Sequence, residues 1–536
     1  MKIVVADDLP ASALELLRAE RGWTVDARTG RTQVDLASDL ADADALLVRS
    51  ATKVDAGLLA AAPALRIVAR AGTGVDNVDV AAATARGIVV VNAPGANSIS
   101  VAEHTLALML SLARSVPAAD RAMKEERWEK RGFLGTELRG KTLGVAGLGR
   151  IGQEVAQRAR AFGMRVVAHD PFISAELAAG LGVELLSLDE MCGTADYLTL
   201  HLPSTAETRH VFNDDRFGRC KAGIRLINTA RGDLIDAEAL GRAIESGIVA
   251  AAALDVFETE PPKDWSLAKL PQVIATPHIA ASTEEAQELV GLETAAAVRD
   301  FLRDGVVRNA VNFPSLSPDE FQRLRPWLRL ADRLGAIASQ MGPARIEAIG
   351  VRYYGALADD PAAKVLASSV AAGVLRPILS GGVSMVNACT AARERGIEIV
   401  ESRSSRPRHF TSLVSVKLHT SAGERWVEGT VFEPSTPRLV SVRGVEVDAP
   451  LGGTMLILSN DDRPGVIGDV GTMLGRHGVN IANFALGRGD AGAIGVVNVD
   501  EDASSARALD AAVGEIRRLP AIREAWVIRL DPPRQA

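Results

Sequence analysis

Three side chains in the middle of this 536-residue chain combine a cation, a carboxylate and an imidazole. Arg231 lies in the string NTARG, Glu260 in FETEPP and His278 in TPHIAAST. A histidine can take a proton from an alcohol near neutral pH, and a carboxylate on its second nitrogen strengthens it as a base. A guanidinium can hold a substrate carboxylate through two hydrogen bonds. Singly, each residue could be a surface cation, a turn residue or a loop histidine, but together they indicate oxidation of a 2-hydroxy acid.

A glycine-rich string, GLGRIG, precedes these residues and indicates where a hydride acceptor would bind. Gly147 permits a tight turn, Gly149 lets the backbone approach a pyrophosphate, and Gly152 lets a helix pack closely on the sheet. Asp170 follows at the distance, about 20 residues, where a carboxylate can accept hydrogen bonds from ribose hydroxyls. No Arg or Lys comes directly after Asp170, which favours NAD over NADP. The structural alternative is a tight turn without a ligand.

Composition excludes several classes of function. The net charge is −7 and neither sign forms a long run, so we expect no nucleic-acid partner. Cys192, Cys220 and Cys389 are odd in number and far apart, which favours free thiols in a reducing compartment over disulfides or a metal site. The chain shows no signal segment and no membrane-spanning apolar run. These features predict a cytoplasmic protein without a membrane partner.

The positions of apolar segments predict an α/β fold with two Rossmann-like lobes. Short apolar runs alternate with helical stretches, as in parallel strands joined by crossover helices. We expect an interrupted substrate-binding lobe of residues 1–95 and 283–310, and an NAD-binding Rossmann domain of residues 96–282. Residues 315–450 should form an intervening α/β domain. Residues 452–536 read βαββαβ, the split ferredoxin-like order.

Two long helices should connect the lobes. A capping box of Ser100 and Glu103 predicts the start of the first, and one of Ser282 and Glu285 predicts the start of the second, which should end near Gly305. The string NFPSLSPDE at residues 312–320 has the prolines and serines of a linker.

The strings GLGRIG, HLPST, INTARG, ALDVFETEPP and TPHIAAST resemble the D-isomer-specific 2-hydroxyacid dehydrogenases over about residues 1–310. The resemblance implies NAD-dependent hydride transfer with Arg231, Glu260 and His278 as catalytic residues, and no metal. Asp255, which ends a strand, should hold the nicotinamide amide. The remaining cofactor contacts that the resemblance implies come from Arg150, Ile151, Thr205, Ala230, Arg231 and the segment His278 to Ala281.

Polar groups at strand ends of the first lobe predict the substrate's chemistry. Gly72 and Gly74 would expose backbone N–H groups to a carboxylate. The lobe offers more cations than one carboxylate requires, which favours a doubly anionic substrate such as a phosphorylated acid. The candidate substrate-binding residues are Arg49, Ser50, Arg70, Gly72, Thr73, Gly74 and Asn97.

The end of the chain resembles the ACT ligand-sensing domain in the strings DRPG and VNIAN. A dehydrogenase, an intervening block and a terminal ACT domain together resemble the long-form phosphoglycerate dehydrogenase family. This resemblance implies oxidation of 3-phosphoglycerate to 3-phosphohydroxypyruvate on the way to L-serine, feedback by serine, and a homotetramer. It also makes Asn460, Asp462 and Asn480 candidate serine-site residues, although Ser459 and Asn460 stand near where the family often has His or Tyr.

Three alternatives remain. The substrate could be another 2-hydroxy acid, such as glyoxylate, lactate or 2-hydroxyglutarate. The chain could be a non-catalytic protein that responds to NAD. The ACT domain could serve dimerisation alone.

Overall fold

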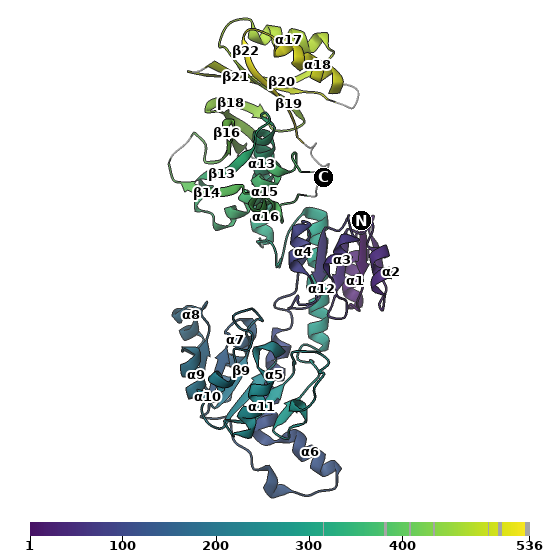
Figure 1. Cartoon of the computed structure of the whole chain (residues 1–536), viewed down its shortest axis with the longest axis vertical. Helices are drawn as coiled ribbons and strands as arrows, with labels where there is room; N and C mark the ends of the chain where they lie inside the picture. Colours follow the sequence, from purple (N-terminus) through teal and green to yellow (C-terminus); the bar gives the residue numbers. More distant parts are fainter. Residues whose placement is uncertain are drawn as a thin grey trace.

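The computed structural model describes residues 1–314, 316–379, 383–406, 409–432, 435–490, 492–501 and 506–530. The chain is elongated, with four sheets arranged from the nucleotide-binding lobe at one end to the C-terminal sheet at the other (Figure 1). Within the described residues, no helix combines the length and apolarity that crossing a membrane requires. The expected α/β class is confirmed.

The first lobe is a five-stranded parallel sheet in the order β2-β1-β3-β4-β5. Alternate apolar residues of its strands pack on both faces against helices. Its strands are β1 (Lys2–Val5), β2 (Thr24–Ala27), β3 (Ala45–Val48), β4 (Ile67–Arg70) and β5 (Val89–Val91). Its helices are α1 (Ala11–Arg18), α2 (Gln33–Asp39), α3 (Ala56–Ala60) and α4 (Val80–Ala85).

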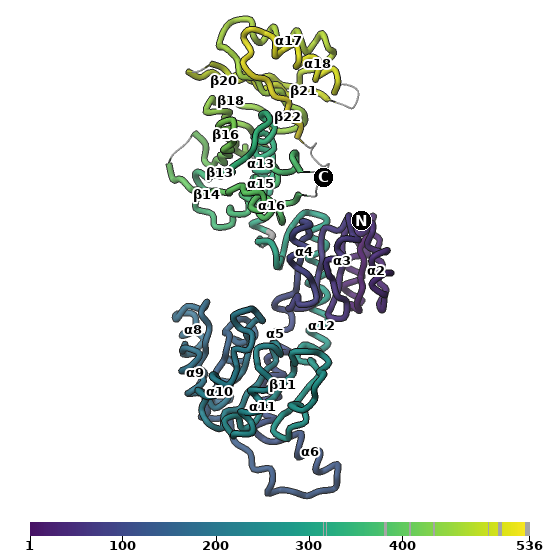
Figure 2. The backbone as a smooth tube through the Cα atoms, in the orientation of Figure 1, coloured from purple at the N-terminus to yellow at the C-terminus, as the bar shows by residue number. Residues whose placement is uncertain are grey.

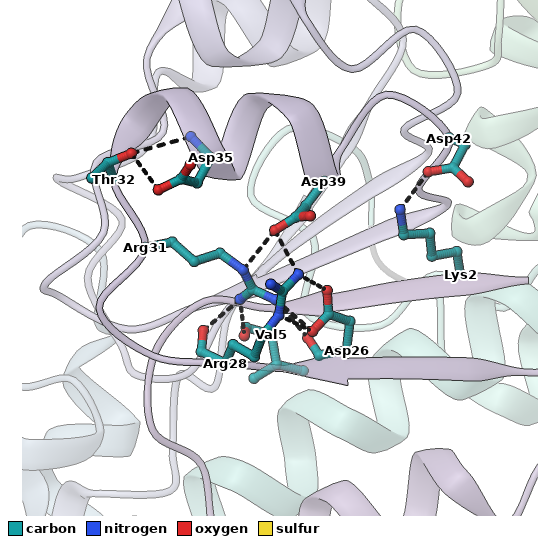
Figure 3. A network of polar contacts seen from close by, with 9 residues as sticks. All are labelled: Lys2, Val5, Asp26, Arg28, Arg31, Thr32, Asp35, Asp39 and Asp42. Atoms are coloured by element: carbon teal, nitrogen blue, oxygen red, sulfur yellow. Dashed lines mark hydrogen bonds and ion pairs between the residues drawn. The ribbon is translucent and has the colours of Figure 1, made fainter.

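A network of charges fixes the edge strand β2 to α2 (Figure 3). The side chain of Arg31 is almost fully buried and bonds Asp26, Asp39 and the carbonyl of Val5. Arg28 adds hydrogen bonds to both carboxylates. The bond from Arg28, opposed by burial and helped by Arg31, lowers the pKa of Asp26 to about 2. These charges also protect a sheet edge from pairing with another strand.

The second lobe is a seven-stranded parallel sheet in the order β12-β11-β10-β9-β6-β7-β8, which places the switch in strand order between β6 and β9. Its strands are β6 (Thr142–Ala146), β7 (Arg165–His169), β8 (Glu184–Leu185), β9 (Tyr197–Leu200), β10 (Ile224–Asn228), β11 (Val249–Leu254) and β12 (Val273–Ala275). Its helices are α7 (Arg150–Ala161), α8 (Ala175–Gly180), α9 (Leu188–Thr194), α10 (Asp214–Gly218) and α11 (Ala237–Glu245), with 3-10 turns η2 (Gly232–Leu234) and η3 (Leu267–Lys269).

Two helices, α5 (Ser98–Arg114) and α12 (Glu284–Asp304), carry the chain between the lobes. Both predicted capping boxes are wrong. Ser100 lies inside α5, and its hydroxyl lies 2.7 Å from that of Thr283, which is the residue that caps α12. Thr283 accepts the N–H of Ala286 at 3.2 Å, so α12 begins one residue later than predicted. The predicted end at Gly305 is confirmed, with a left-handed φ of 78°.

After α5 the chain forms an arm of α6 (Val116–Lys124) and the 3-10 turn η1 (Lys130–Phe133). The arm projects from the far end of the second lobe (Figure 1). Four large apolar side chains on it face solvent: Val116, Met123, Trp128 and Leu134.

The intervening region contains a six-stranded mixed sheet in the order β14-β13-β15-β16-β17-β18. The predicted linker is wrong in its second half, because Ser317 and Glu320 form the capping box of α13 (Pro318–Gln340). The strands are β13 (Ile346–Gly355), β14 (Glu398–Ser404), β15 (Ser412–Thr420), β16 (Gly423–Phe432), β17 (Thr436–Val442) and β18 (Val445–Pro450). The other helices are α14 (Ala356–Asp359), η4 (Pro361–Lys364), α15 (Val365–Leu375) and α16 (Ala388–Glu394).

The C-terminal unit confirms the predicted βαββαβ order. Its antiparallel sheet has the order β20-β21-β19-β22, with the first strand of the unit, β19, in the interior. Both helices cover the face turned away from the intervening sheet (Figure 2). The elements are β19 (Thr454–Asn460), α17 (Val466–Arg476), β20 (Ile481–Gly489), β21 (Gly492–Val499), α18 (Ala506–Ile516) and β22 (Ile522–Arg529).

Candidate active site

His278 and Glu260 form an ion pair beyond the ends of neighbouring strands β12 and β11. Nδ1 of His278 lies 2.7 Å from Oε2 of Glu260, and the other carboxylate oxygen accepts the N–H of Phe257 at 3.1 Å. The bond to Glu260, opposed by burial, raises the pKa of His278. Burial pulls the pKa of Glu260 upward, but the bonds from His278 and Phe257 hold it below its usual value. With Nδ1 engaged, Nε2 is the nitrogen that can take a substrate proton.

The carboxylate of Asp255, which is expected to hold the nicotinamide amide, is hydrogen-bonded to the segment that carries His278. This carboxylate is fully buried, and its oxygens accept the hydroxyl of Thr276 at 2.6 Å and the N–H groups of Ile279 and Ala280 at 2.9 Å each. The backbone N–H of His278 donates to the carbonyl of Asp255 at 2.8 Å. Asp255 therefore fixes the segment that carries the imidazole, and His278 is held at a left-handed φ of 53°.

Arg231 meets the first lobe directly. One guanidinium nitrogen donates to the carbonyl of Ala230 at 2.7 Å, and another lies 3.2 Å from a carboxylate oxygen of Asp76. A Cβ on Gly74 would lie 2.0 Å from the same guanidinium, so the absence of a side chain allows this approach. Arg231 is also near enough to His278 to oppose the rise in the pKa of that histidine.

Arg70, a cation of the first lobe, lies beside Arg231 of the second lobe. Burial, and then the charge of Arg231, lowers the pKa of Arg70. Its guanidinium lies over Gly72, where a Cβ would stand 1.6 Å from a side-chain nitrogen. Two guanidiniums that face one exposed carboxylate, Asp76, form a place where an anion is favoured.

The other predicted substrate residues are spread around this point. Thr73 donates its hydroxyl to the side chain of Asn97 at 2.9 Å, which joins the glycine loop to the start of α5. Arg49 donates to the side chain of Gln287 on α12, and Ser50 is exposed. The structure thus brings Arg70, Gly72 and Gly74 to Arg231, whereas the Arg49 guanidinium is engaged by α12.

The glycine-rich turn fits a pyrophosphate. Gly147 has a φ of 93°, and a Cβ on Gly152 would stand 2.1 Å from the Gly147 carbonyl oxygen. A Cβ on Gly149 would meet nothing within 4 Å, which leaves space for a ligand beside the start of α7. The carboxylate of Asp170 accepts the N–H of Leu148 at 2.8 Å, so it lies at the base of this turn.

The remaining predicted cofactor residues lie around the same sheet edge. Arg150 begins α7 and its side chain reaches Gly95 in the crossover, where a Cβ would stand 2.4 Å from its guanidinium. Ile151 follows it in the helix. The N–H of Thr205 bonds the Thr208 hydroxyl, that of Ala230 bonds the Asn228 side chain, and the carbonyl of Ala281 accepts from Gln287.

Sequence reasoning missed His104. It lies on α5, and its Nε2 is 3.3 Å from the Thr276 hydroxyl and 3.5 Å from an Asp255 oxygen. The histidine therefore joins the crossover helix to the carboxylate that fixes the His278 segment. A polar residue on a largely apolar helix was the available signal, but sequence alone could not show what it faces.

The three candidate effector residues do not converge within one chain. Asn460 ends β19, where it pairs with Ala493, and Asp462 follows it. Asn480 precedes β20, whose Ile481 pairs with Val499 at the opposite end of the sheet. Six residues of strand, roughly 20 Å, separate the two groups. A site that uses all three side chains requires a second copy of the chain.

Comparisons with known proteins agree with this geometry. Residues 106–280 match the model of the D-isomer specific 2-hydroxyacid dehydrogenase, NAD binding domain, which confirms NAD as the cofactor. Residues 323–443 match the D-3-phosphoglycerate dehydrogenase intervening domain, and residues 454–520 match the ACT domain.

Relatives cover nearly the whole chain. D-3-phosphoglycerate dehydrogenase of Archaeoglobus fulgidus is 44% identical over 91% of this chain and 92% of its own. The enzyme of the same name from Methanocaldococcus jannaschii is 40% identical over 99% and 100%. The structure of D-lactate dehydrogenase from Aquifex aeolicus, in complex with NAD and lactic acid, is 30% identical and covers 59% of this chain and all of its own, with a TM-score of 0.51. The chain therefore belongs to the D-3-phosphoglycerate dehydrogenase family of NAD-dependent 2-hydroxyacid dehydrogenases.

Proposed function

We propose that the chain oxidises 3-phosphoglycerate to 3-phosphohydroxypyruvate with NAD, the first step towards L-serine. The observation that carries this proposal is the meeting of the two lobes at Arg231. There the second lobe supplies a guanidinium and an imidazole paired with Glu260, and the first lobe supplies Arg70. The names and near full-length similarity of the relatives support the choice of substrate.

Each residue has a proposed role in the reaction. Nε2 of His278 takes the proton of the substrate hydroxyl, and Glu260 stabilises the imidazolium that forms. Arg231 holds the substrate carboxylate and polarises the carbon–oxygen bond beside it. NAD, held at Gly147 to Gly152 with its ribose near Asp170, supplies the hydride acceptor.

The phosphate requires a second cationic group, and we assign it to the first lobe. Arg70 is a half-buried cation close enough to Arg231 for that charge to lower its pKa, and the loop from Gly72 to Gly74 lies beside it. Arg49 is bonded to Gln287 on α12, and its charge also lowers the pKa of Arg70. A guanidinium binds phosphate oxygens in the same forked geometry as a carboxylate.

The test is a panel of 2-hydroxy acids with NAD, followed by the formation of NADH. We expect 3-phosphoglycerate to have the highest kcat/KM, and Arg70→Ala to reduce kcat/KM more for this substrate than for lactate. If lactate, glycolate (the reduced form of glyoxylate) or 2-hydroxyglutarate has a higher kcat/KM than 3-phosphoglycerate, that acid is the substrate instead. Tight NAD binding without turnover of any acid would indicate a regulatory protein instead of an enzyme.

The structure also supports a proposal for assembly and regulation. We assign the exposed apolar arm of residues 116–134 and the C-terminal sheet to contacts between copies, as in a homotetramer. A second copy of the sheet would bring Asp462 of one chain towards the Asn480 end of the other, where serine could bind. The three free cysteines are consistent with a reducing compartment such as the cytoplasm.

Titration calorimetry tests the effector proposal. We expect serine to bind the wild type and to bind Asn480→Ala at least about tenfold more weakly, because the variant lacks the amide that would hydrogen-bond the charged serine. Equal affinity for both proteins would exclude Asn480. Sedimentation of the same samples reports the number of copies, and a monomer would exclude a site shared between chains.

A further inference from the structure

A short turn of the intervening region, residues 384–387, is hydrogen-bonded to the first lobe. The side chain of Asn387 donates to the carbonyl of Ala85 at 3.1 Å, and the hydroxyl of Ser384 donates to the carbonyl of Gly87 at 3.0 Å. Asn387 is buried in this contact. The turn is held in shape by a bond from the N–H of Ser384 to the Asn387 side chain at 2.9 Å.

The two accepting carbonyls lie at the C-terminal end of α4. The last carbonyls of a helix have no partner within it, so a donor from another element completes this end. Gly87 has a φ of 73°, and a Cβ there would stand 2.7 Å from the Ser384 hydroxyl and 3.2 Å from the Asn387 amide. The lack of a side chain at Gly87 is therefore what lets the intervening turn reach the end of α4.

The opposite end of α4 is joined to the loop that faces Arg231. Asp79 caps the start of α4 through the N–H of Ala82 at 2.8 Å, and its own N–H bonds the carbonyl of Val54. Asp79 is also the last residue of the loop that begins at Gly72. Helix α4 is a single short element of six residues, and it connects the contact at Ala85 and Gly87 with the loop that ends at Asp79.

We propose that Ser384 and Asn387 are positioning residues for the substrate loop at residues 72–79. They hold α4 at its C-terminal end, and α4 in turn sets how closely Gly74 and Asp76 approach Arg231. This inference rests on the proposed function, because the loop is assigned to substrate binding there. It predicts an effect on the KM for the substrate and little effect on the KM for NAD, whose glycine turn lies in the other lobe.

The same contact gives a route from the C-terminal sheet to the active site. The side-chain amide of Gln340, the last residue of α13, pairs with both backbone groups of Arg529 on β22, at 3.0 and 3.3 Å. The intervening region is thus bonded to the C-terminal sheet at one end and to α4 at the other.

The first test uses steady-state kinetics of the full-length protein. Asn387→Ala and Ser384→Ala should each raise the substrate KM, measured with 3-phosphoglycerate, roughly 2- to 10-fold, the range expected for loss of the one neutral hydrogen bond that each makes to the first lobe, with the KM for NAD unchanged. Ser402→Ala is the matched control, because Ser402 accepts a hydrogen bond from Arg352 elsewhere in the intervening region. A substrate KM that stays at the wild-type value in both variants would overturn the proposal, as would an equal rise in both KM values.

A second variant disrupts the contact between residues 384–387 and α4 from the side of the first lobe. Gly87→Ala places a methyl group against Ser384, and Gly30→Ala is its control, since Gly30 has a φ of 74° and open space around it. Both substitutions carry the same backbone strain. We expect Gly87→Ala alone to raise the substrate KM, and its effect to be less than additive with that of Asn387→Ala. Equal effects of the two glycine variants, or full additivity with Asn387→Ala, would contradict the contact.

Hydrogen exchange separates failure of this inference from failure of the proposed substrate. The amides of residues 72–79 should exchange faster in Asn387→Ala than in the wild type and Ser402→Ala, whichever acid the enzyme oxidises. If another acid proves to be the substrate, its KM is the one that should rise. Unchanged exchange at residues 72–79 would overturn the positioning role even if 3-phosphoglycerate is the substrate.

Discussion

Replacing Asp255 by Asn removes a charge and one acceptor while keeping the size of the side chain. The carboxylate accepts from three donors: Thr276 and Ile279 on one oxygen, and Ala280 on the other. An Asn has one carbonyl oxygen, so its NH2 group must face at least one of these donors. The site is fully buried, and water cannot supply the missing acceptor.

The size of the effect follows from this geometry. Loss of one hydrogen bond to a charged group costs about 1.5–3 kcal/mol, and each 1.36 kcal/mol is tenfold in rate. If the His278 segment must be held in place when the proton is transferred, kcat/KM for Asp255→Asn falls about 10- to 150-fold. Thr276→Val also removes one hydrogen bond to this charged carboxylate, but both backbone donors keep their acceptors, so its loss should not exceed that of Asp255→Asn.

The assay is the initial rate of NADH formation with the hydroxy acid and NAD each varied at saturation of the other, and thermal unfolding of each variant is measured in parallel. The positioning role is refuted if Asp255→Asn keeps kcat/KM within about threefold of the wild type. A rise confined to the KM for NAD would instead support the original expectation that Asp255 holds the nicotinamide amide.

Three further predictions concern protons and space. Oxidation needs a neutral His278, so kcat/KM should rise with pH through its raised pKa, and Glu260→Gln should move this limb to lower pH; an unmoved limb would exclude the pair. The pKa of Asp26 is about 2, below its unfolded value of 3.8. Its contribution to the free energy of unfolding should therefore be present above pH 3.8 and be lost as the pH falls towards 2. Acid denaturation of the wild type and Asp26→Asn measures this contribution. Gly149→Ala should keep the wild-type Tm but weaken NAD binding, whereas Gly152→Ala should lower the Tm; the reverse pattern would contradict the pyrophosphate site.

Much of the fold follows from local patterns. Parallel strands appear in the sequence as short apolar runs. The C-terminal βαββαβ order was predicted correctly because each strand and helix there has a clear hydrophobic periodicity and is bounded by turn residues. The capping boxes at Ser100 and Ser282 failed because α5 starts before Ser100, and α12 is capped one residue later than predicted, by the side chain of Thr283 on the N–H of Ala286.

The site was predictable to a similar extent. Arg231, Glu260 and His278 stand in distinctive strings at strand ends, and the order of strands places such ends together. The role of Asp255 depends on which backbone N–H groups fold over it, which the sequence does not show. His104 gave no signal beyond its polarity, because its partners Asp255 and Thr276 lie more than 150 residues further along the chain, just beyond the ends of β11 and β12.

The central claim is that His278, backed by Glu260, is the base for NAD-dependent oxidation of 3-phosphoglycerate. The most direct measurement compares NADH formation by the wild type and His278→Ala, together with NAD affinity by fluorescence. We predict a kcat that falls about 10²- to 10⁴-fold in His278→Ala while the Kd for NAD is retained. A His278→Ala protein that forms NADH from 3-phosphoglycerate at the wild-type rate would contradict the account.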